Sequence, residues 1–204
     1  MVLKLKIERM RRLEEMSDWK DMQSPKIATE LNYRPARRIV TGEDEQGRSI
    51  ISSDGPAPNV VFSPFSPGTG QVLWATGSGV ATGDDPAPAG HRFGFHSEGG
   101  SLLRIADFAP DEEIDSQKLS KFLTENQVLG ERPGRHFWFH KTHSLDYAIV
   151  LEGEIYAMLD VGETLMRAGD VLIQRATSHS WSNRSGKWCR MAFVLLALPE
   201  DESR

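Results

Sequence analysis

Two short stretches in the C-terminal half carry histidines at spacings that could place them in one site. In the first, His140, Thr142 and Asp146 are separated by even numbers of residues. In the second, His179 and Trp181 are two residues apart. Alternate residues of a β-strand point to the same face, so each set is expected to share one face of its strand. Imidazole and carboxylate groups transfer protons and bind metal ions in proteins, and two neighbouring strands would combine these sets into a candidate site.

The two stretches resemble the signature motifs of the cupins, a family of small jelly-roll β-barrels. The first family pattern is Gly-x5-His-x-His-x3-Glu-x6-Gly, and the residues that fall on it in register are Gly134, His140, Asp146 and Gly153. The second is Gly-x5-Pro-x-Gly-x2-His-x3-Asn, which Gly169, His179 and Asn183 match with one residue fewer between the glycine and the histidine. The chain is also similar to a subgroup of bacterial and fungal single-barrel cupins that has no single established activity.

The resemblance implies a divalent metal ion held by His140, Asp146 and His179. Cupins commonly use two histidines and a glutamate of the first motif together with the histidine of the second. Here Thr142 stands in place of the second histidine and Asp146 in place of the glutamate. The remaining two imidazoles and one carboxylate suit iron, and also zinc, manganese or nickel. The alternative is that these are core histidines of a barrel that has lost its metal.

Five further residues are candidates for catalysis or substrate binding. His143 could replace the missing ligand only if a bulge turned it inward, and it is otherwise a surface or mouth residue. His143 or Tyr147 could transfer a proton to or from the substrate. Thr142 would leave a coordination position to water or substrate, and Trp181 could hold an apolar or planar group. Gln174 could donate a hydrogen bond to the substrate or satisfy the backbone of a turn.

From these residues we expect a metal-dependent enzyme that acts on a small or medium organic acid or keto-enol substrate. The expected reaction is a lyase-type step, either decarboxylation or dehydration. One alternative is an iron-dependent oxygenase that uses the same three ligands, which oxygen uptake would distinguish. Another is a non-catalytic cupin that binds a small molecule without metal.

Short strands must position the candidate residues. Segments rich in β-branched and aromatic residues alternate with polar, Gly- or Pro-containing turns, which indicates a closed or sandwiched all-β fold. The expected strands cover residues 37–40, 48–52, 60–62, 71–74, 102–108, 146–151, 155–159, 171–174, 180–182 and 189–198. We therefore expect an all-β jelly-roll cupin barrel over residues 37–198, with a short helix or turn at 115–125.

The remaining segments lie outside this barrel or over its mouth. Apolar residues at three- and four-residue spacing predict an amphipathic helix over 3–19, within an N-terminal arm of residues 1–36. Residues 63–100 are rich in Gly and Pro and are expected to form long loops that cover the mouth of the barrel. The tail 199–204 is expected to be disordered. The arm and the open barrel edges favour a homodimer.

Composition narrows the classes of partner. The chain has 204 residues, 39% hydrophobic and 26% charged, with a net charge of −5. This balance predicts a folded protein with a small-molecule substrate, and it argues against a nucleic-acid or membrane partner. Cys189 is the single cysteine, which excludes a disulfide framework. With no signal-like segment at the start, the expected location is cytoplasmic.

Overall fold

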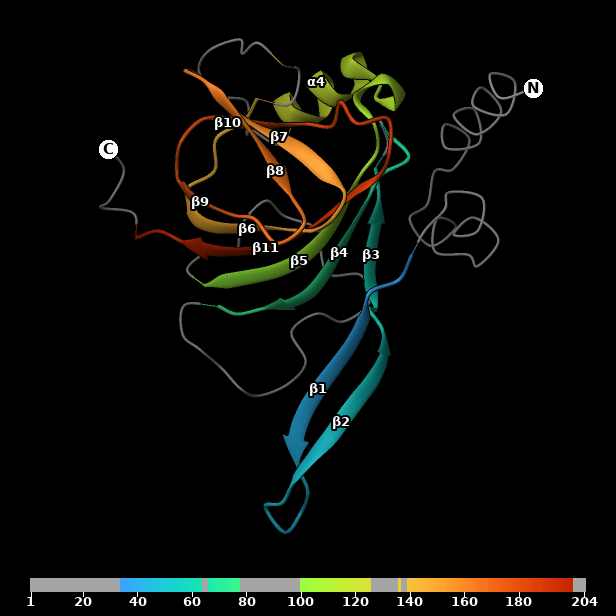
Figure 1. Cartoon of the computed structure of the whole chain (residues 1–204). Coiled ribbons are helices and arrows are strands. Elements are labelled where there is room, and N and C mark those ends of the chain that lie inside the picture. Colours follow the sequence, from blue (N-terminus) through green and yellow to red (C-terminus); the bar gives the residue numbers. More distant parts are fainter. Residues whose placement is uncertain (1–33, 64–65, 78–99, 126–135, 137–138, 200–204) are drawn as a thin grey trace, which may run out of the picture.

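The computed structural model describes residues 34–63, 66–77, 100–125, 136 and 139–199 (Figure 1). Most of these residues lie in short antiparallel strands, so the predicted all-β class is confirmed. The predicted arm helix at 3–19, residues 64–65 and 78–99 of the predicted loops at 63–100, and residues 200–204 of the predicted tail lie outside the described residues.

Two antiparallel sheets form the barrel (Figure 1). The larger sheet has six strands in the order β3-β4-β5-β11-β6-β9, and the smaller has three in the order β10-β7-β8. The bounds of the six-stranded sheet are β3 Asn59–Phe62, β4 Thr69–Ala75, β5 Ser101–Phe108, β11 Cys189–Ala197, β6 Ser144–Glu152 and β9 Val171–Arg175. Those of the three-stranded sheet are β10 His179–Ser182, β7 Glu154–Leu159 and β8 Glu163–Arg167.

Alternation of side chains along the strands separates the core from the outer surface. On β6, for example, Ala148 and Val150 are buried, whereas Tyr147 and Ile149, which alternate with them, are partly exposed. The buried residues of both sheets pack together as one cluster, which includes Val72, Leu102, Ala148, Val150, Ile155, Ala157, Met166, Trp181, Met191, Phe193 and Leu195. The inner faces of the two sheets therefore form the core.

A β-hairpin projects away from the barrel (Figure 1). Its strands, β1 Arg37–Glu43 and β2 Ser49–Pro56, form a separate two-stranded sheet. Both strands run further than expected, because antiparallel pairing from Arg37↔Pro56 to Glu43↔Ser49 includes residues of the predicted turns. Residues 37–56 were expected to be the first part of the barrel, but they form this separate hairpin.

A 3-10 turn, η1 Asp111–Glu113, and a helix, α4 Ser116–Glu125, connect β5 to the segment before β6. A short helix or turn was expected at 115–125, and the structure has the helix. Its start is fixed by Asp115, whose Oδ1 accepts hydrogen bonds from the backbone N–H groups of Gln117 and Lys118. In the part of the chain that the structure describes, no helix has the length and apolar character needed to cross a membrane.

Candidate active site

The candidate residues of the first stretch face the barrel interior. His140 and Thr142, just before β6, and Asp146 within it are 3–4% exposed. This agrees with the even spacing that predicted a shared face. The charged and imidazole side chains buried on the inward faces of this stretch, β5 and β10, namely Arg104, His140, Asp146 and His179, are called the interior cluster below.

His140 and His179 lie directly beside each other. Their backbones form an isolated antiparallel bridge, with His140 N–H donating to the His179 carbonyl at 2.9 Å and His179 N–H donating to the His140 carbonyl at 3.0 Å. Their ring centroids are 4.3 Å apart. The bridge links the two histidine-bearing stretches, so the proximity expected from the sequence is present.

The surroundings of His179 keep its imidazole neutral. Burial lowers its pKa to about 4, a hydrogen bond with the Thr177 carbonyl opposes this shift, and the positive charge of Arg104 adds to it. Nδ1 lies 2.9 Å from that carbonyl oxygen. A carbonyl only accepts hydrogen bonds, so Nδ1 carries the proton and Nε2 keeps its lone pair. His179 therefore offers an unprotonated Nε2 in the buried interior.

Asp146 adjoins a short chain of hydroxyl groups on the same face. Ser144 Oγ donates to Thr142 Oγ1 at 3.0 Å, and Thr142 Oγ1 lies 3.5 Å from Asp146 Oδ2, at the outer limit of a hydrogen bond. Ser144 is completely buried. Thr142 thus contacts the carboxylate that stands at the family's glutamate position.

Arg104 on β5 is a buried cation that the sequence analysis did not identify. It is 9% exposed, and its Cζ lies 5.0 Å from the ring centroid of Phe193. Burial lowers its pKa to about 10 and the negative charge of Asp146 opposes that shift, so the guanidinium stays charged at neutral pH. The alternation of Leu102, Arg104 and Ala106 on the inward face of β5 was the available signal.

Trp181 and Gln174 are both buried. The Trp181 ring centroid lies 5.9 Å from that of His179 and 5.6 Å from that of Phe193, so Trp181 is the part of the core that contacts the interior cluster. Gln174 Nε2 donates to the Thr177 carbonyl at 2.6 Å and also contacts Thr177 Oγ1. Gln174 was expected to bind the substrate or to hydrogen-bond the backbone of a turn, and in the structure it bonds the turn before β10.

His143 and Tyr147 are not brought to the interior cluster. His143 is half-buried, and its Nε2 lies 3.1 Å from the carbonyl oxygen of Pro199 near the end of β11. Tyr147 alternates with the inward residues Asp146 and Ala148 and lies on the outer face of β6. No bulge turns His143 inward, so neither residue enters the proposal below as a proton donor or acceptor.

The predicted metal ligands are not arranged as one donor set. Within the described ranges, no three His, Cys, Asp or Glu side chains are placed to share one metal ion. The two imidazoles meet, but the Asp146 carboxylate interacts with the guanidinium of Arg104. As placed, these residues do not form a three-ligand centre, and metal binding by His140, Asp146 and His179 stays a prediction.

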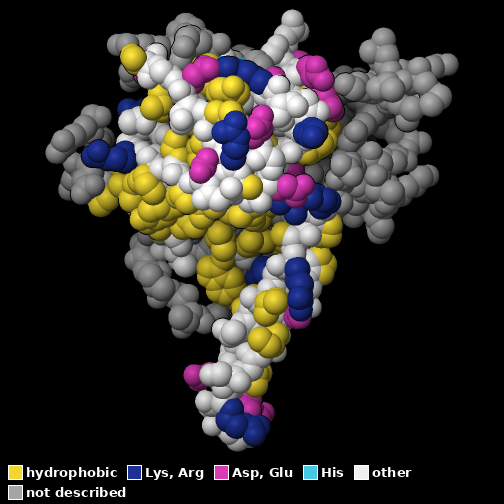
Figure 2. Space-filling model, in the orientation of Figure 1, with side chains coloured by type: hydrophobic (Ala, Val, Ile, Leu, Met, Phe, Trp, Pro, Cys, Tyr) yellow, Lys and Arg dark blue, Asp and Glu magenta, His cyan; other side chains and the backbone are white. Residues whose placement is uncertain are grey.

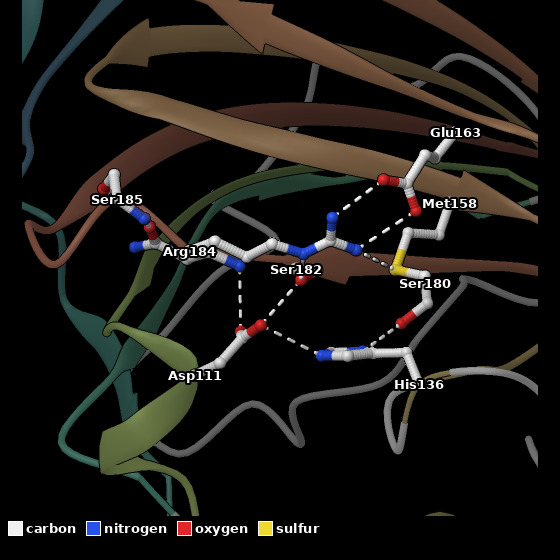
Figure 3. A network of polar contacts seen from close by, with 9 residues as sticks. Asp111, His136, Met158, Glu163, Ser180, Ser182, Arg184 and Ser185 are labelled. Carbon is white, nitrogen blue, oxygen red and sulfur yellow. Dashed lines mark hydrogen bonds and ion pairs between the residues drawn. The ribbon is translucent and has the colours of Figure 1, made fainter.

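A polar network fixes the opposite face of β10 (Figure 3). Asp111 Oδ2 accepts hydrogen bonds from Ser182 Oγ at 2.6 Å and from His136 Nε2 at 3.1 Å, and His136 Nδ1 lies 2.7 Å from Ser180 Oγ. Asp111, His136 and Ser180 are the residue types of a nucleophilic triad, but Ser180 is 0% exposed. This network therefore fastens η1 to β10 and holds His179 in place on the inner side.

Comparison with known proteins identifies relatives in fungal biosynthesis. The oryzines biosynthesis cluster protein J of Aspergillus oryzae is 43% identical over 169 residues, which cover 82% of this chain and 86% of that protein. The cupin-domain-containing oxidoreductase srdD of Neurospora crassa is 34% identical, covering 80% of this chain and 76% of the relative. The cupin-domain-containing oxidoreductase fogC of Aspergillus ruber is 30% identical, covering 78% of this chain and 71% of the relative.

Other matches are partial. Two phomopsin biosynthesis cluster proteins of Diaporthe leptostromiformis are 40% identical over 105 residues, and this chain spans only 43% of their length. No family model matches the chain. Among solved structures, a Cupin 2 conserved barrel domain protein from Salinispora arenicola is 15% identical, with a TM-score of 0.37 and coverage of 68% of this chain and 81% of that one.

Proposed function

The chain belongs to the cupin family, and we propose that it is an enzyme that binds a small organic acid or enolisable carbonyl compound inside its barrel. One observation carries the proposal: the interior cluster places a buried guanidinium, a carboxylate and two imidazoles among aromatic side chains. Buried charges are costly unless they are paired or serve a ligand, so such a group is a candidate site for chemistry.

The cluster supplies two complementary functions for an acid or enolisable substrate. The guanidinium of Arg104 would attract a carboxylate or enolate, and the low dielectric of the interior strengthens that attraction. Nε2 of His179 would accept a proton from the carbon next to a carbonyl group. The charge that moves onto the carbonyl oxygen would then be stabilised by the fixed positive charge of Arg104.

Stabilisation of an enolate is common to the two lyase-type reactions expected from the sequence, and proton removal from carbon is needed for the dehydration alone. In a dehydration, loss of a proton next to the carbonyl gives the enolate that expels hydroxide. In a decarboxylation, the same cation stabilises the enolate left by carbon dioxide. We propose a lyase step of this kind on an intermediate of small-molecule biosynthesis, since several relatives are named as biosynthesis-cluster proteins.

The names of other relatives favour a second candidate. srdD and fogC are named oxidoreductases, which supports oxidation of the same class of substrate by this chain, as in the expected iron-dependent oxygenase. Oxygen uptake by protein supplied with Fe²⁺, measured with substrate present, separates this candidate from the lyase. A lyase consumes no dioxygen, whereas an oxygenase consumes at least one equivalent per turnover.

The proposal is tested with phenylpyruvate and phenylacetone, an acid and its neutral analogue in which a methyl group replaces the carboxylate. We expect the protein to bind phenylpyruvate more tightly by calorimetry. We also expect it to accelerate deuterium exchange of the phenylpyruvate methylene protons above the buffer rate by NMR. Arg104→Met should weaken phenylpyruvate binding by about tenfold or more, because it removes a charge-assisted contact.

Arg48→Met is the matched control, since Arg48 is an exposed arginine on the projecting hairpin. It should bind both probes as the wild type does. Equal affinity for the two probes in the wild type, or unchanged phenylpyruvate affinity in Arg104→Met, would refute an acid-binding role for the interior cluster.

A further inference from the structure

The turn that leads into β10 is held by Gln174, near the end of β9. Its Nε2 donates hydrogen bonds to the Thr177 carbonyl at 2.6 Å and to Thr177 Oγ1. Gln174 is 2% exposed and is the register partner of Asp146 on β6, so it belongs to the inward face of the six-stranded sheet. A buried amide with two acceptors on one residue fixes the position of that residue.

The carbonyl oxygen of Thr177 accepts two hydrogen bonds, one from Gln174 and one from His179. Nδ1 of His179 lies 2.9 Å from this oxygen. Both donors belong to buried side chains, whereas Thr177 itself is exposed. The orientation of the Thr177 carbonyl therefore determines where the Nδ1–H bond of His179 points, and Gln174 holds that orientation.

Other contacts hold the backbone of His179. It is the register partner of Leu159 on β7, and its N–H and carbonyl groups form the bridge with His140. Neither pairing involves the Thr177 carbonyl or the imidazole ring. Loss of the hydrogen bonds from Gln174 should therefore release the ring of His179 while its backbone stays in place.

The backbone of this turn is strained at Ala176. Among the described residues, Ala176 is the one residue other than glycine with a left-handed backbone, at a φ of +51°. Its N–H donates to the Ser144 carbonyl at 3.1 Å, and Gln174 holds the residue that follows it. A strained backbone persists only where surrounding contacts maintain it, and such residues gather at functional sites. Ser144 and Gln174 together maintain the turn that places the Thr177 carbonyl.

The proton position on His179 depends on partners inside the barrel. His179 is 4% exposed, and Figure 2 shows no histidine of the described residues on the face that it presents. A neutral imidazole carries its proton on either Nδ1 or Nε2, and the hydrogen bond made by one nitrogen sets which form is present. With the proton on Nε2, that nitrogen has no lone pair to accept a proton from a substrate.

We propose that Gln174 is a positioning residue that keeps His179 in the tautomer with an unprotonated Nε2. It acts through the Thr177 carbonyl, which accepts the Nδ1 proton, and it needs no contact with the substrate. The proposal rests on the role of His179 as a base proposed above. Without the Gln174 amide, the two tautomers of His179 should interconvert, and only one of them can accept a proton at Nε2.

The first test observes the tautomer directly. Long-range proton–nitrogen NMR spectra at neutral pH distinguish protonated from unprotonated ring nitrogens, and the signals of His179 are those missing from His179→Gln. The wild type should carry its proton on Nδ1. Gln174→Met keeps the length of the side chain but removes both N–H groups. In this variant the two nitrogen resonances of His179 should shift towards their mean, because the two tautomers exchange.

Gln71→Met is the matched control for the loss of a buried amide. Gln71 is 0% exposed, its Nε2 donates to the Arg34 carbonyl at 3.1 Å, and its Oε1 accepts from the Ala36 N–H at 2.7 Å. It lies on β4, which three strands separate from β9 in the six-stranded sheet. Its replacement should leave the nitrogen resonances of His179 unchanged.

The second test measures the consequence for proton transfer. Gln174→Met should bind phenylpyruvate as the wild type does, because Arg104 is unchanged. Deuterium exchange of the phenylpyruvate methylene protons should slow by about tenfold, which is a typical loss on removing a group that orients a functional histidine. A substitution that only loosened the barrel would weaken binding as well, so the two measurements together separate positioning from a general structural effect.

Either of two results overturns the proposal. A wild-type His179 with its proton on Nε2 would exclude the Thr177 carbonyl as the acceptor, and this measurement needs no variant to fold. An unchanged tautomer in Gln174→Met would show that the turn keeps its shape without the amide. A changed tautomer with an unchanged rate of deuterium exchange would support the positioning role of Gln174 and refute instead the role of His179 as the base.

Discussion

A neutral histidine in the interior makes the stability of this protein depend on pH. His179 has a pKa of about 4 in the folded protein, whereas an exposed histidine in the unfolded chain titrates near its usual value of 6.5. Between these pH values the unfolded state binds a proton that the folded state does not. The free energy of unfolding should therefore fall as pH is lowered from about 6.5 towards 4, by up to about 3 kcal/mol from this group.

Urea denaturation at several pH values between 4.5 and about 7.5 measures this dependence. His179→Gln should flatten the slope over the same window, since glutamine does not titrate. His143→Gln is the control, because the half-buried His143 lies outside the interior cluster. An equal slope in His179→Gln and the wild type would show that His179 does not cause the pH dependence.

At the scale of single residues, the alternation of positions along a strand predicted which side chains are buried better than it predicted their functions. The inward placement of His140, Asp146 and His179 follows from even spacing and strand pairing, and both can be read from sequence. Arg104 was missed because a charged residue within an apolar strand is ordinarily assigned to the outer face. Its interior position depends on Asp146 and Phe193, which are contributed by strands distant in the chain.

At the scale of elements, the turn between β6 and β7 is determined by Gly153. Its φ of +79° lies in the left-handed region, and a Cβ built there would lie 2.6 Å from the Trp188 carbonyl oxygen. Gly162, in the turn between β7 and β8, has a similar φ of +87° but no atom within 4 Å of such a Cβ. Substitutions at the two glycines therefore distinguish the cost of a left-handed backbone from the cost of steric overlap.

We expect Gly162→Ala to destabilise the fold by about 1 kcal/mol, the cost of the left-handed backbone for alanine. Gly153→Ala should cost about 2 kcal/mol more, because the chain near Trp188 must also shift. Chemical denaturation of the two variants measures both values. Equal decreases in the free energy of unfolding would mean that the backbone around Trp188 shifts at no measurable cost.

Most of the strands that position the site could be predicted from the sequence, and β8 is the exception. β8 was not predicted, because only Met166 of its five residues is buried and the stretch Glu163–Arg167 shows little apolar alternation. Pairing with β7 across the tight turn at 160–162 makes it a strand, and this pairing overrides the weak strand propensity of the segment. By contrast, β6 and β11 have strong alternating patterns that identified them directly.

At the scale of the whole molecule, the sequence predicted a barrel but not the projection of the hairpin. The segments 37–40 and 48–52 have ordinary strand patterns, which carry no information about which sheet a strand joins. Only the pairing of β1 with β2 alone reveals that the hairpin stands apart from the barrel.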